Sequence, residues 1–223
     1  MRLIPTFLLA FAIGAALPAF ASVDAPKAGA EYTALETALP TQAEKGKIEV
    51  IEFFSYACPH CRAFDPVLAA WVKKNADKIS FRRVHVAFRP AEMPLQRMYT
   101  TFEAMGLTES MHQKVFTALH EENVRLMSDN AVFDWVAKAG VDRAKFIATY
   151  KSFGMPSRVS AAQASVNGFN VDLWPSIGID GRFYTSPSKV ATTAGVVQTN
   201  ELQQQNGLAV MDFLVAKAKA EKK

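Results

Sequence analysis

The chain has 223 residues, of which 50% are hydrophobic and 21% are charged, and its net charge is +4 at pH 7. This is the size and composition of an ordinary globular protein of one or two domains. Basic and acidic residues are mixed along the chain, and the net charge is too small to indicate a nucleic-acid partner.

Residues 1–21 have the pattern of a secretory signal peptide. Arg2 precedes a long apolar run, and Ala19-Phe20-Ala21 fits the small-x-small cleavage pattern, which predicts a mature chain that begins at Ser22. An uncleaved membrane anchor is the alternative, because the apolar run is almost long enough to span a bilayer. A proline beside the small residues favours cleavage, so we expect export to an oxidising compartment.

The next part of the chain predicts an α/β unit. Residues 22–46 lack a clear periodicity and are expected to form an irregular arm. A strand is expected over Ile48–Phe54, a helix over residues 58–75 and a second strand over Phe81–Phe88. Pro66 lies inside this helix and should kink it, because a proline removes one helical hydrogen bond.

A block of helices is predicted between residues 90 and 170. Glycine after the last turn, and serine or aspartate before the first, mark the ends of these helices. The predicted helices cover residues 95–105, 108–120, 129–139, 142–151 and 156–168.

Strand character returns after the helical block. Ser176–Ile179 and Arg182–Thr185 flank Asp180-Gly181, and Asp-Gly between two strand-like runs is a strong signal for a β-hairpin. The chain then ends in an amphipathic helix, in which Leu208, Met211, Leu214 and Val215 recur at helical spacing. The order of these elements predicts an α/β core that is interrupted by an all-helical insertion.

The only two cysteines of the chain lie in Cys58-Pro59-His60-Cys61, at the junction of the first strand and the first helix. Cysteines with this spacing at such a junction can form a disulfide and indicate a redox dithiol. Unpaired N–H groups and the helix dipole favour a thiolate on Cys58. Pro59 suits the first helical turn, and His60 adds a hydrogen-bond donor or a positive charge beside Cys58. We expect Cys58 to be the exposed nucleophile and Cys61 to be the buried resolving cysteine.

Two other uses of the cysteines are weaker hypotheses. A zinc site needs two more ligands, and His85, His112 and His120 lack the spacing of metal ligands. A structural disulfide across so short a loop would restrict the unfolded chain very little. We therefore expect no metal, and no cofactor other than the redox-active Cys58–Cys61 disulfide.

Several other residues could take part in catalysis or binding, but a structural role is the preferred interpretation for each. His85 shares a strand face with Phe81 and is expected to be a hydrogen-bonded core residue, whereas His112 and His120 are expected on the surfaces of helices. A set of methionines could line a peptide groove, because methionine adapts to varied partners, but core packing is the preferred interpretation. These residues are Met93, Met98, Met105, Met111 and Met127.

Three features resemble the DsbA family of thiol:disulfide oxidoreductases, a branch of the thioredoxin superfamily. They are the segment Glu52-Phe-Phe-Ser-Tyr-Ala-Cys-Pro-His-Cys61, the Asp180-Gly181 hairpin after a proline, and the size and position of the helical insertion. The resemblance covers nearly the whole mature chain. It implies a thioredoxin-like domain of residues 22–89 and 171–223, with an inserted helical domain of residues 90–170. It also implies a low cysteine pKa and an oxidising potential, for which DsbA is itself a reference example.

The resemblance implies a substrate-binding role for the loop before the hairpin. Pro175 is the expected cis-proline, which faces the sulfurs of the dithiol and holds an extended substrate segment. Trp174 stands where the family usually has a small or β-branched residue such as valine or threonine. Its ring would either form an aromatic wall beside the sulfurs or turn away and pack in the core.

The resemblance also implies a proton-exchange role for an acid on the first strand. Glu52 shares its strand face with apolar residues, so burial would raise its pKa and allow it to exchange protons with Cys61. Asp65 and Arg83 fall where the family has a second acid and a base. A plain structural ion pair is the alternative, and the two interpretations are compatible.

Together these features predict a disulfide oxidase. It would donate its Cys58–Cys61 disulfide to reduced, newly exported proteins of the periplasm by thiol–disulfide exchange through a mixed disulfide. A DsbB-type, quinone-linked membrane protein would reoxidise it. We expect a monomer, because the segment before the first strand is too short for the added dimerisation domain of a DsbC-type isomerase. A reductase or isomerase on the same fold, and a non-catalytic peptide-binding module, are the alternatives.

Overall fold

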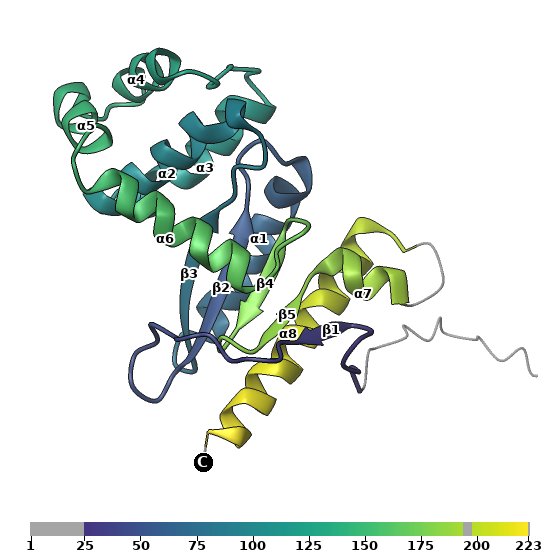
Figure 1. Cartoon of the computed structure of the whole chain (residues 1–223). Coiled ribbons are helices and arrows are strands. Elements are labelled where there is room, and N and C mark those ends of the chain that lie inside the picture. Colours follow the sequence, from purple (N-terminus) through teal and green to yellow (C-terminus); the bar gives the residue numbers. More distant parts are fainter. Residues whose placement is uncertain (1–24, 194–197, 223) are drawn as a thin grey trace, which may run out of the picture.

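The structure, a computed structural model, describes residues 25–193 and 198–222 (Figure 1). The signal peptide predicted for residues 1–21 lies outside the described residues. The centre of the molecule is a five-stranded mixed sheet with the order β1-β5-β4-β2-β3, in which β2 and β3 are parallel and the other neighbours antiparallel. The strands are β1 (Tyr32–Ala34), β2 (Ile48–Phe54), β3 (Ile79–His85), β4 (Ser176–Ile179) and β5 (Phe183–Thr185).

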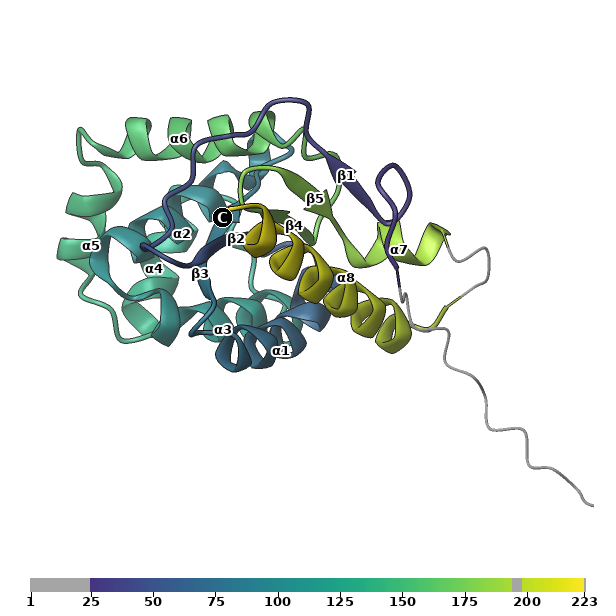
Figure 2. The same ribbon diagram turned by 90° about the horizontal axis from the view of Figure 1, so that it is seen from below.

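Helices cover both faces of this sheet and extend the molecule at one end. In Figures 1 and 2, α1 and α8 lie on one face of the sheet and α6 runs across the other. A short 3-10 helix and α2 to α6 are inserted between β3 and β4. The helices are α1 (Pro59–Lys74), η1 (Pro90–Glu92), α2 (Met93–Met105), α3 (Thr108–His120), α4 (Asp129–Lys138), α5 (Arg143–Tyr150), α6 (Met155–Gly168), α7 (Pro187–Thr193) and α8 (Asn200–Glu221).

All seven residues of the central strand β2 are buried. Successive side chains of a strand point to opposite faces, so Ile48 and Val50 pack with α1 and α8 whereas Ile51 and Phe53 pack beneath α6. Phe54, the last residue of the strand, joins a third apolar cluster that is formed mainly by the inserted helices. The residues that follow Phe54 therefore lie where the core of the sheet meets the inserted helices.

The predicted fold class, an α/β core interrupted by helices, is confirmed, and the helix bounds within the insertion agree to within two residues. The predicted hairpin is also present. Asp180 and Gly181 have φ values of 55° and 65°, as both central residues of a type I′ turn require. A Cβ at Gly181 would lie 2.2 Å from the carbonyl oxygen of Leu39, so this turn has room only for glycine.

Two strands differ from the prediction. The irregular arm expected for residues 22–46 contains β1, which pairs with β5 near the other end of the chain. A three-residue strand is too short to show a periodic pattern, and only its distant partner makes it a strand. The second predicted strand is shifted, because β3 pairs with β2 residue by residue from Ile79 opposite Ile48 to His85 opposite Phe54.

The C-terminal region is more helical than predicted. α7 was not expected, and α8 begins at Asn200, where Thr199 caps the helix by accepting the N–H of Leu202. Across the part of the chain that the structure describes, we find no helix with the length and apolar character that crossing a bilayer requires.

Candidate active site

Cys58 is the N-cap residue of α1. Its backbone is extended, with φ −92° and ψ 117°, and its Sγ accepts the backbone N–H of Cys61 at 3.3 Å. This contact satisfies one of the free N–H groups in the first turn and stabilises negative charge on the sulfur. The side chain is half-buried, which leaves the sulfur partly accessible.

These surroundings lower the pKa of Cys58 to about 6. The largest cause is the hydrogen bond with the Cys61 thiol, and the backbone N–H groups of Cys61 and His60 and the charge of His60 add to it against the opposing effect of burial. Cys58 is therefore mainly a thiolate at neutral pH, which is the reactive form. Pro59 and His60 are both exposed, and Pro59 is the first residue of α1, where its missing N–H has no helical partner.

Cys61 lies in the opposite environment. It is completely buried and packs with Phe54 and Tyr56 in the apolar cluster of the inserted helices. Burial raises the pKa of Cys61 strongly, and the neighbouring Cys58 sulfur raises it further. The protein thus keeps one cysteine of the pair as a thiolate and the other as a neutral thiol.

The loop before β4 faces Cys58. The peptide bond between Trp174 and Pro175 is cis, as predicted. The carbonyl oxygen of Trp174 lies 3.7 Å from Sγ of Cys58, which donates to it when protonated. The half-buried ring of Trp174 lies 5.4 Å from the ring of Phe88, which is 71% exposed, and we call this pair the Phe88–Trp174 ledge. A small pocket of about 30 Å³ between Pro175 and His60 adjoins the same loop.

A charge cluster formed by Glu52 of β2, Asp65 of α1 and Arg83 of β3 adjoins Cys61. Arg83 donates through Nε to Oε2 of Glu52 at 2.7 Å and through Nη2 to Oδ1 of Asp65 at 2.9 Å. Burial raises the pKa of Glu52 to about 7, while the charge of Arg83 opposes this rise and that of Asp65 adds to it. Glu52 can therefore gain or lose a proton near neutral pH. Its charge is also one of the causes that raise the pKa of Cys61.

The predicted burial of the histidines agrees with the structure for His85 but not for all three residues. His85 is a buried, hydrogen-bonded core residue, as predicted. The prediction that His112 and His120 lie on helix surfaces is wrong for His112 and only partly right for His120. His112 is 5% exposed and contacts Asp65, and His120 is half-buried against Tyr56. Tyr56 was missed altogether, because nothing in the sequence indicates that histidines from β3 and α3 meet it.

The methionines pack mostly as expected. Met98 and Met111 are buried in the apolar cluster of the inserted helices, Met105 packs against it, and Met93 is half-buried. Met127 is 43% exposed, so the core-packing prediction is wrong for this residue. It lies in the connection before α4 rather than on a helix face that meets the core.

Comparison with known proteins agrees with this geometry. A family model described as thioredoxin matches residues 42–199. The thiol:disulfide interchange protein DsbA of Burkholderia cepacia is 34% identical over 221 residues, or 99% of each chain. That of Bordetella parapertussis is 37% identical over 182 residues, which cover 82% of this chain and 86% of the relative. The chain belongs to the DsbA family.

Solved structures of DsbA proteins have the same architecture. The crystal structure of Pseudomonas aeruginosa DsbA superposes with a TM-score of 0.79 at 31% identity, and the match covers 91% of this chain and 100% of that chain. This DsbA-family protein is therefore a thiol:disulfide oxidoreductase with a thioredoxin-like fold and an inserted set of helices. It exchanges disulfides with substrate proteins and with a redox partner.

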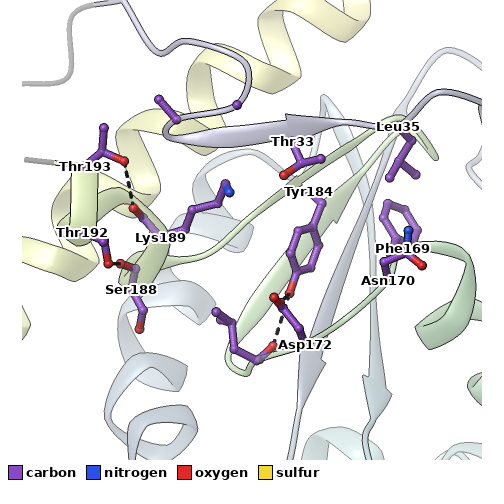
Figure 3. A pocket seen from close by; sticks show the side chains of 13 residues that line it. Thr33, Leu35, Phe169, Asn170, Asp172, Tyr184, Ser188, Lys189, Thr192 and Thr193 are labelled. Atoms are coloured by element: carbon purple, nitrogen blue, oxygen red, sulfur yellow. Dashed lines mark hydrogen bonds between the residues drawn. The ribbon is translucent and has the colours of Figure 1, made fainter.

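Two large cavities among the described residues are lined by residues other than Cys58 and Cys61. One of about 720 Å³ is lined by residues of β1, β5 and α7 and of the segment after α6, and in it Tyr184 donates a hydrogen bond to Asp172 at 3.1 Å (Figure 3). A second, of about 680 Å³, lies between α3 and α4 and includes Trp135. Within residues 25–193 and 198–222, no group of three or more histidine, cysteine or acidic side chains is arranged to hold a metal ion.

Proposed function

We propose that this protein oxidises the cysteines of newly exported proteins in the periplasm, with Cys58 as the attacked sulfur and Cys61 as its buried partner. The observation that supports the proposal best is the contrast between the lowered pKa of Cys58, about 6, and the raised pKa of Cys61. A stabilised thiolate on Cys58 favours the dithiol form of the protein. The disulfide form is then a strong oxidant.

The first exchange breaks the Cys58–Cys61 bond. A substrate thiolate attacks Sγ of Cys58, because this sulfur is partly accessible whereas Cys61 is buried. A bond forms between the substrate sulfur and Cys58, and the electron pair of the broken bond leaves on Sγ of Cys61. Cys61 then takes up a proton, since burial disfavours its thiolate, and we assign Glu52 as the donor because its pKa is about 7.

The second exchange releases the oxidised substrate. A second substrate thiolate attacks the substrate sulfur of the mixed disulfide, and Cys58 leaves as a thiolate that the N–H groups of the first helical turn stabilise. Two electrons have then passed from the substrate dithiol to the protein. Reoxidation runs in the opposite direction, with Cys58 attacking a disulfide of the partner and Cys61, deprotonated by Glu52, closing the bond to Cys58.

The loop of Trp174 and Pro175 is proposed to hold the substrate. An extended chain bound along this loop would bring its cysteine to Sγ of Cys58, which the carbonyl of Trp174 approaches at 3.7 Å. The Phe88–Trp174 ledge offers apolar surface to the side chains that unfolded proteins expose. The protein would therefore prefer unfolded substrates with an apolar or aromatic residue near the cysteine.

Three further features complete the proposal. We propose that a DsbB-type, quinone-linked membrane protein is the reoxidant, that the protein acts as a monomer, and that it needs no cofactor besides its own disulfide. Cell-wide trapping of a Cys61→Ser variant in a mixed disulfide would identify the reoxidant, and light scattering of the purified protein would give its oligomeric state. A stable dimer with isomerase activity would contradict this part of the proposal.

The reduction potential of the Cys58–Cys61 pair tests the direction of electron flow. Purified protein is equilibrated in glutathione buffers, and the fraction of free thiol is measured. A value near about −120 mV, which is known for DsbA, supports an oxidase, whereas a value near about −270 mV, as in thioredoxin, indicates a reductase.

A cysteine variant tests whether the dithiol performs the reaction at all. Cys58→Ser removes the attacked sulfur, so oxidation of a reduced, unfolded substrate should fall to the uncatalysed rate. Oxidation at the wild-type rate would show that the Cys58–Cys61 pair does not perform the reaction.

A further inference from the structure

Tyr56 lies two residues before Cys58, and each of its three polar groups meets a different histidine. Its backbone N–H donates to Nε2 of His85 at 3.1 Å, and its carbonyl oxygen accepts from Nε2 of His120 at 2.8 Å. Its hydroxyl lies 3.0 Å from Nδ1 of His112. His85 belongs to β3, whereas His112 and His120 both belong to α3 of the insertion. One residue of the active-site loop is thus held from two sides, and His112 alone continues into the charge cluster.

The direction of the hydrogen bonds at His112 follows from its neighbours. Nε2 of His112 lies 2.9 Å from Oδ1 of Asp65. Hydrogen bonding from His112 and the charge of Arg83 hold the pKa of Asp65 below its usual value although burial opposes them, so Asp65 is an ionised acceptor and Nε2 donates to it. Burial lowers the pKa of His112 and keeps the ring neutral, which leaves Nδ1 to accept the proton of the Tyr56 hydroxyl.

The same carboxylate oxygen of Asp65 also accepts Nη2 of Arg83 at 2.9 Å, and Arg83 reaches Glu52 at 2.7 Å. A continuous series of hydrogen bonds therefore joins the Tyr56 hydroxyl to Glu52. We propose that His112 is a positioning residue for disulfide exchange, which holds Asp65 and thereby places Arg83 against Glu52. The proposal rests on the proton-exchange role that the proposed function gives to Glu52.

The physical reason is that Arg83 is shared between two carboxylates. Asp65 is 2% exposed, so each donor to it matters because water cannot replace a lost one. Without His112, the carboxylate of Asp65 would draw Arg83 more closely and away from Glu52. Glu52 would then be less neutralised and harder to ionise.

Other ionisable groups also face these two side chains. Arg83, Asp65, Tyr56, Tyr99 and Cys61 all interact with the charge of Glu52. Asp65, Arg83 and Glu109 influence the pKa of His112, which itself influences the pKa of His85, and Gln113 donates a hydrogen bond to the second oxygen of Asp65. The tyrosines and His85 stay neutral at ordinary pH, since burial raises the pKa of the former and lowers that of the latter. Among these groups, Arg83 is therefore the cation that favours ionisation of Glu52 against the larger, opposing effect of burial.

Three variants distinguish the hydrogen bond that His112 makes to Asp65 from the one it makes to Tyr56. His112→Phe removes both hydrogen bonds at similar ring volume. His112→Gln keeps a side-chain N–H that can reach Asp65, and Tyr56→Phe removes only the hydroxyl that donates to Nδ1. The probe is the pH titration of the Glu52 carboxyl carbon by ¹³C NMR in the reduced full-length protein, assigned by comparison with Glu52→Gln.

We expect the Glu52 midpoint of His112→Phe to move upward by at least about half a pH unit, which is the effect of weakening one close charge pair. His112→Gln should restore most of the wild-type midpoint, and Tyr56→Phe should stay near it. The pH profile of Cys61-dependent exchange should move with the midpoint. If His112→Phe does not fold, His112→Met, which also lacks a donor, takes its place.

An unchanged or lowered midpoint in the donor-less variant would overturn the proposal, and so would equal shifts in His112→Phe and His112→Gln, because a purely structural role would give either result. The titration reads the ionisation of Glu52 and does not depend on catalysis. Wild-type activity in Glu52→Gln would therefore refute the proton-exchange role of Glu52 while leaving the positioning by His112 to be judged separately.

Discussion

Cys58 and Cys61 are close neighbours in the chain, but different parts of the molecule build their surroundings. The surroundings of Cys58 are mostly local, because they consist of the first turn of α1 together with the carbonyl of Trp174. The surroundings of Cys61 are assembled from distant segments. Glu52 comes from β2 and Arg83 from β3, and the apolar cluster around the sulfur comes largely from the inserted helices.

The comparison shows how one short motif can hold two opposite charge states. The Cys61 thiol and the free N–H groups at the helix start stabilise a thiolate on Cys58, whereas an apolar environment excludes charge from Cys61. Because Cys61 is buried, Cys58 is the one sulfur of the pair that is partly accessible.

The largest expected effect concerns the thiolate of Cys58. In the reduced protein, ultraviolet thiolate absorbance should titrate with a midpoint of about 6, far below the usual 9, and Cys58→Ser should abolish this transition.

The same thiolate should make the stability of the reduced protein depend on pH. A cysteine whose pKa is lower in the folded than in the unfolded protein adds to the free energy of unfolding. This contribution is complete above the pKa of the unfolded chain and is lost as pH falls through the pKa of the folded protein. The reduced form should thus lose stability relative to the disulfide form between about pH 9 and pH 6.

Denaturant unfolding of both redox forms across this range measures the difference directly. The disulfide form has no titrating Cys58 and serves as the control. A stability difference that does not change between the two ends of the range would contradict the assignment of the thiolate to Cys58.

The second largest effect should come from loss of proton exchange between Glu52 and Cys61. Glu52→Gln cannot donate or accept a proton, so formation of the mixed disulfide and reoxidation should both slow by on the order of 100-fold. The midpoint of Cys58 should change little. Because the pKa of Glu52 is raised to about 7, its ionisation destabilises the wild type as pH rises from 4.5 to 7, and this loss should be absent from the variant.

Glu49 provides a matched control for this variant. It is a buried glutamate on the same strand, but it pairs with Arg82 at 3.2 Å and not with Arg83. Glu49→Gln should keep wild-type exchange rates. Equal rate losses in Glu49→Gln and Glu52→Gln would mean that the two glutamates act on stability and not on proton exchange.

The same contrast between local and assembled surroundings explains what could be predicted from the sequence. The helix start at Cys58, the Asp180-Gly181 hairpin and the helices of the insertion all depend on short-range patterns, and the structure contains each of them. The meeting of Glu52, Asp65 and Arg83 was expected only by resemblance to the family. Residue spacing could not have shown it, because it depends on how α1 packs against β2 and β3.

The features that were missed are those that depend on contacts between distant segments. His112 was predicted on a surface, since the sequence of α3 does not show that this helix faces α1 and the loop of Tyr56. β1 was missed because it is a short strand that pairs with the distant β5. In both cases the deciding partner lies far away in the chain.

The smallest expected effect concerns the surface beside Cys58. Trp174→Val should lower kcat/KM for a reduced peptide with an aromatic residue next to its cysteine by about 3- to 10-fold, the value of one aromatic contact. A peptide with alanine there should lose much less. Trp174→Val keeps the backbone carbonyl that approaches Sγ of Cys58, so the thiolate midpoint should stay near about 6.

Phe88→Ala should weaken the same preference, because the two rings lie 5.4 Å apart and form one ledge. Phe153→Ala is the control, since this fully exposed ring is no part of the ledge. Equal losses for the aromatic and the alanine peptide in Trp174→Val would show that the ring packs the loop and does not touch the substrate. In that case the selectivity of the Cys58 side would come from the backbone of the Pro175 loop alone.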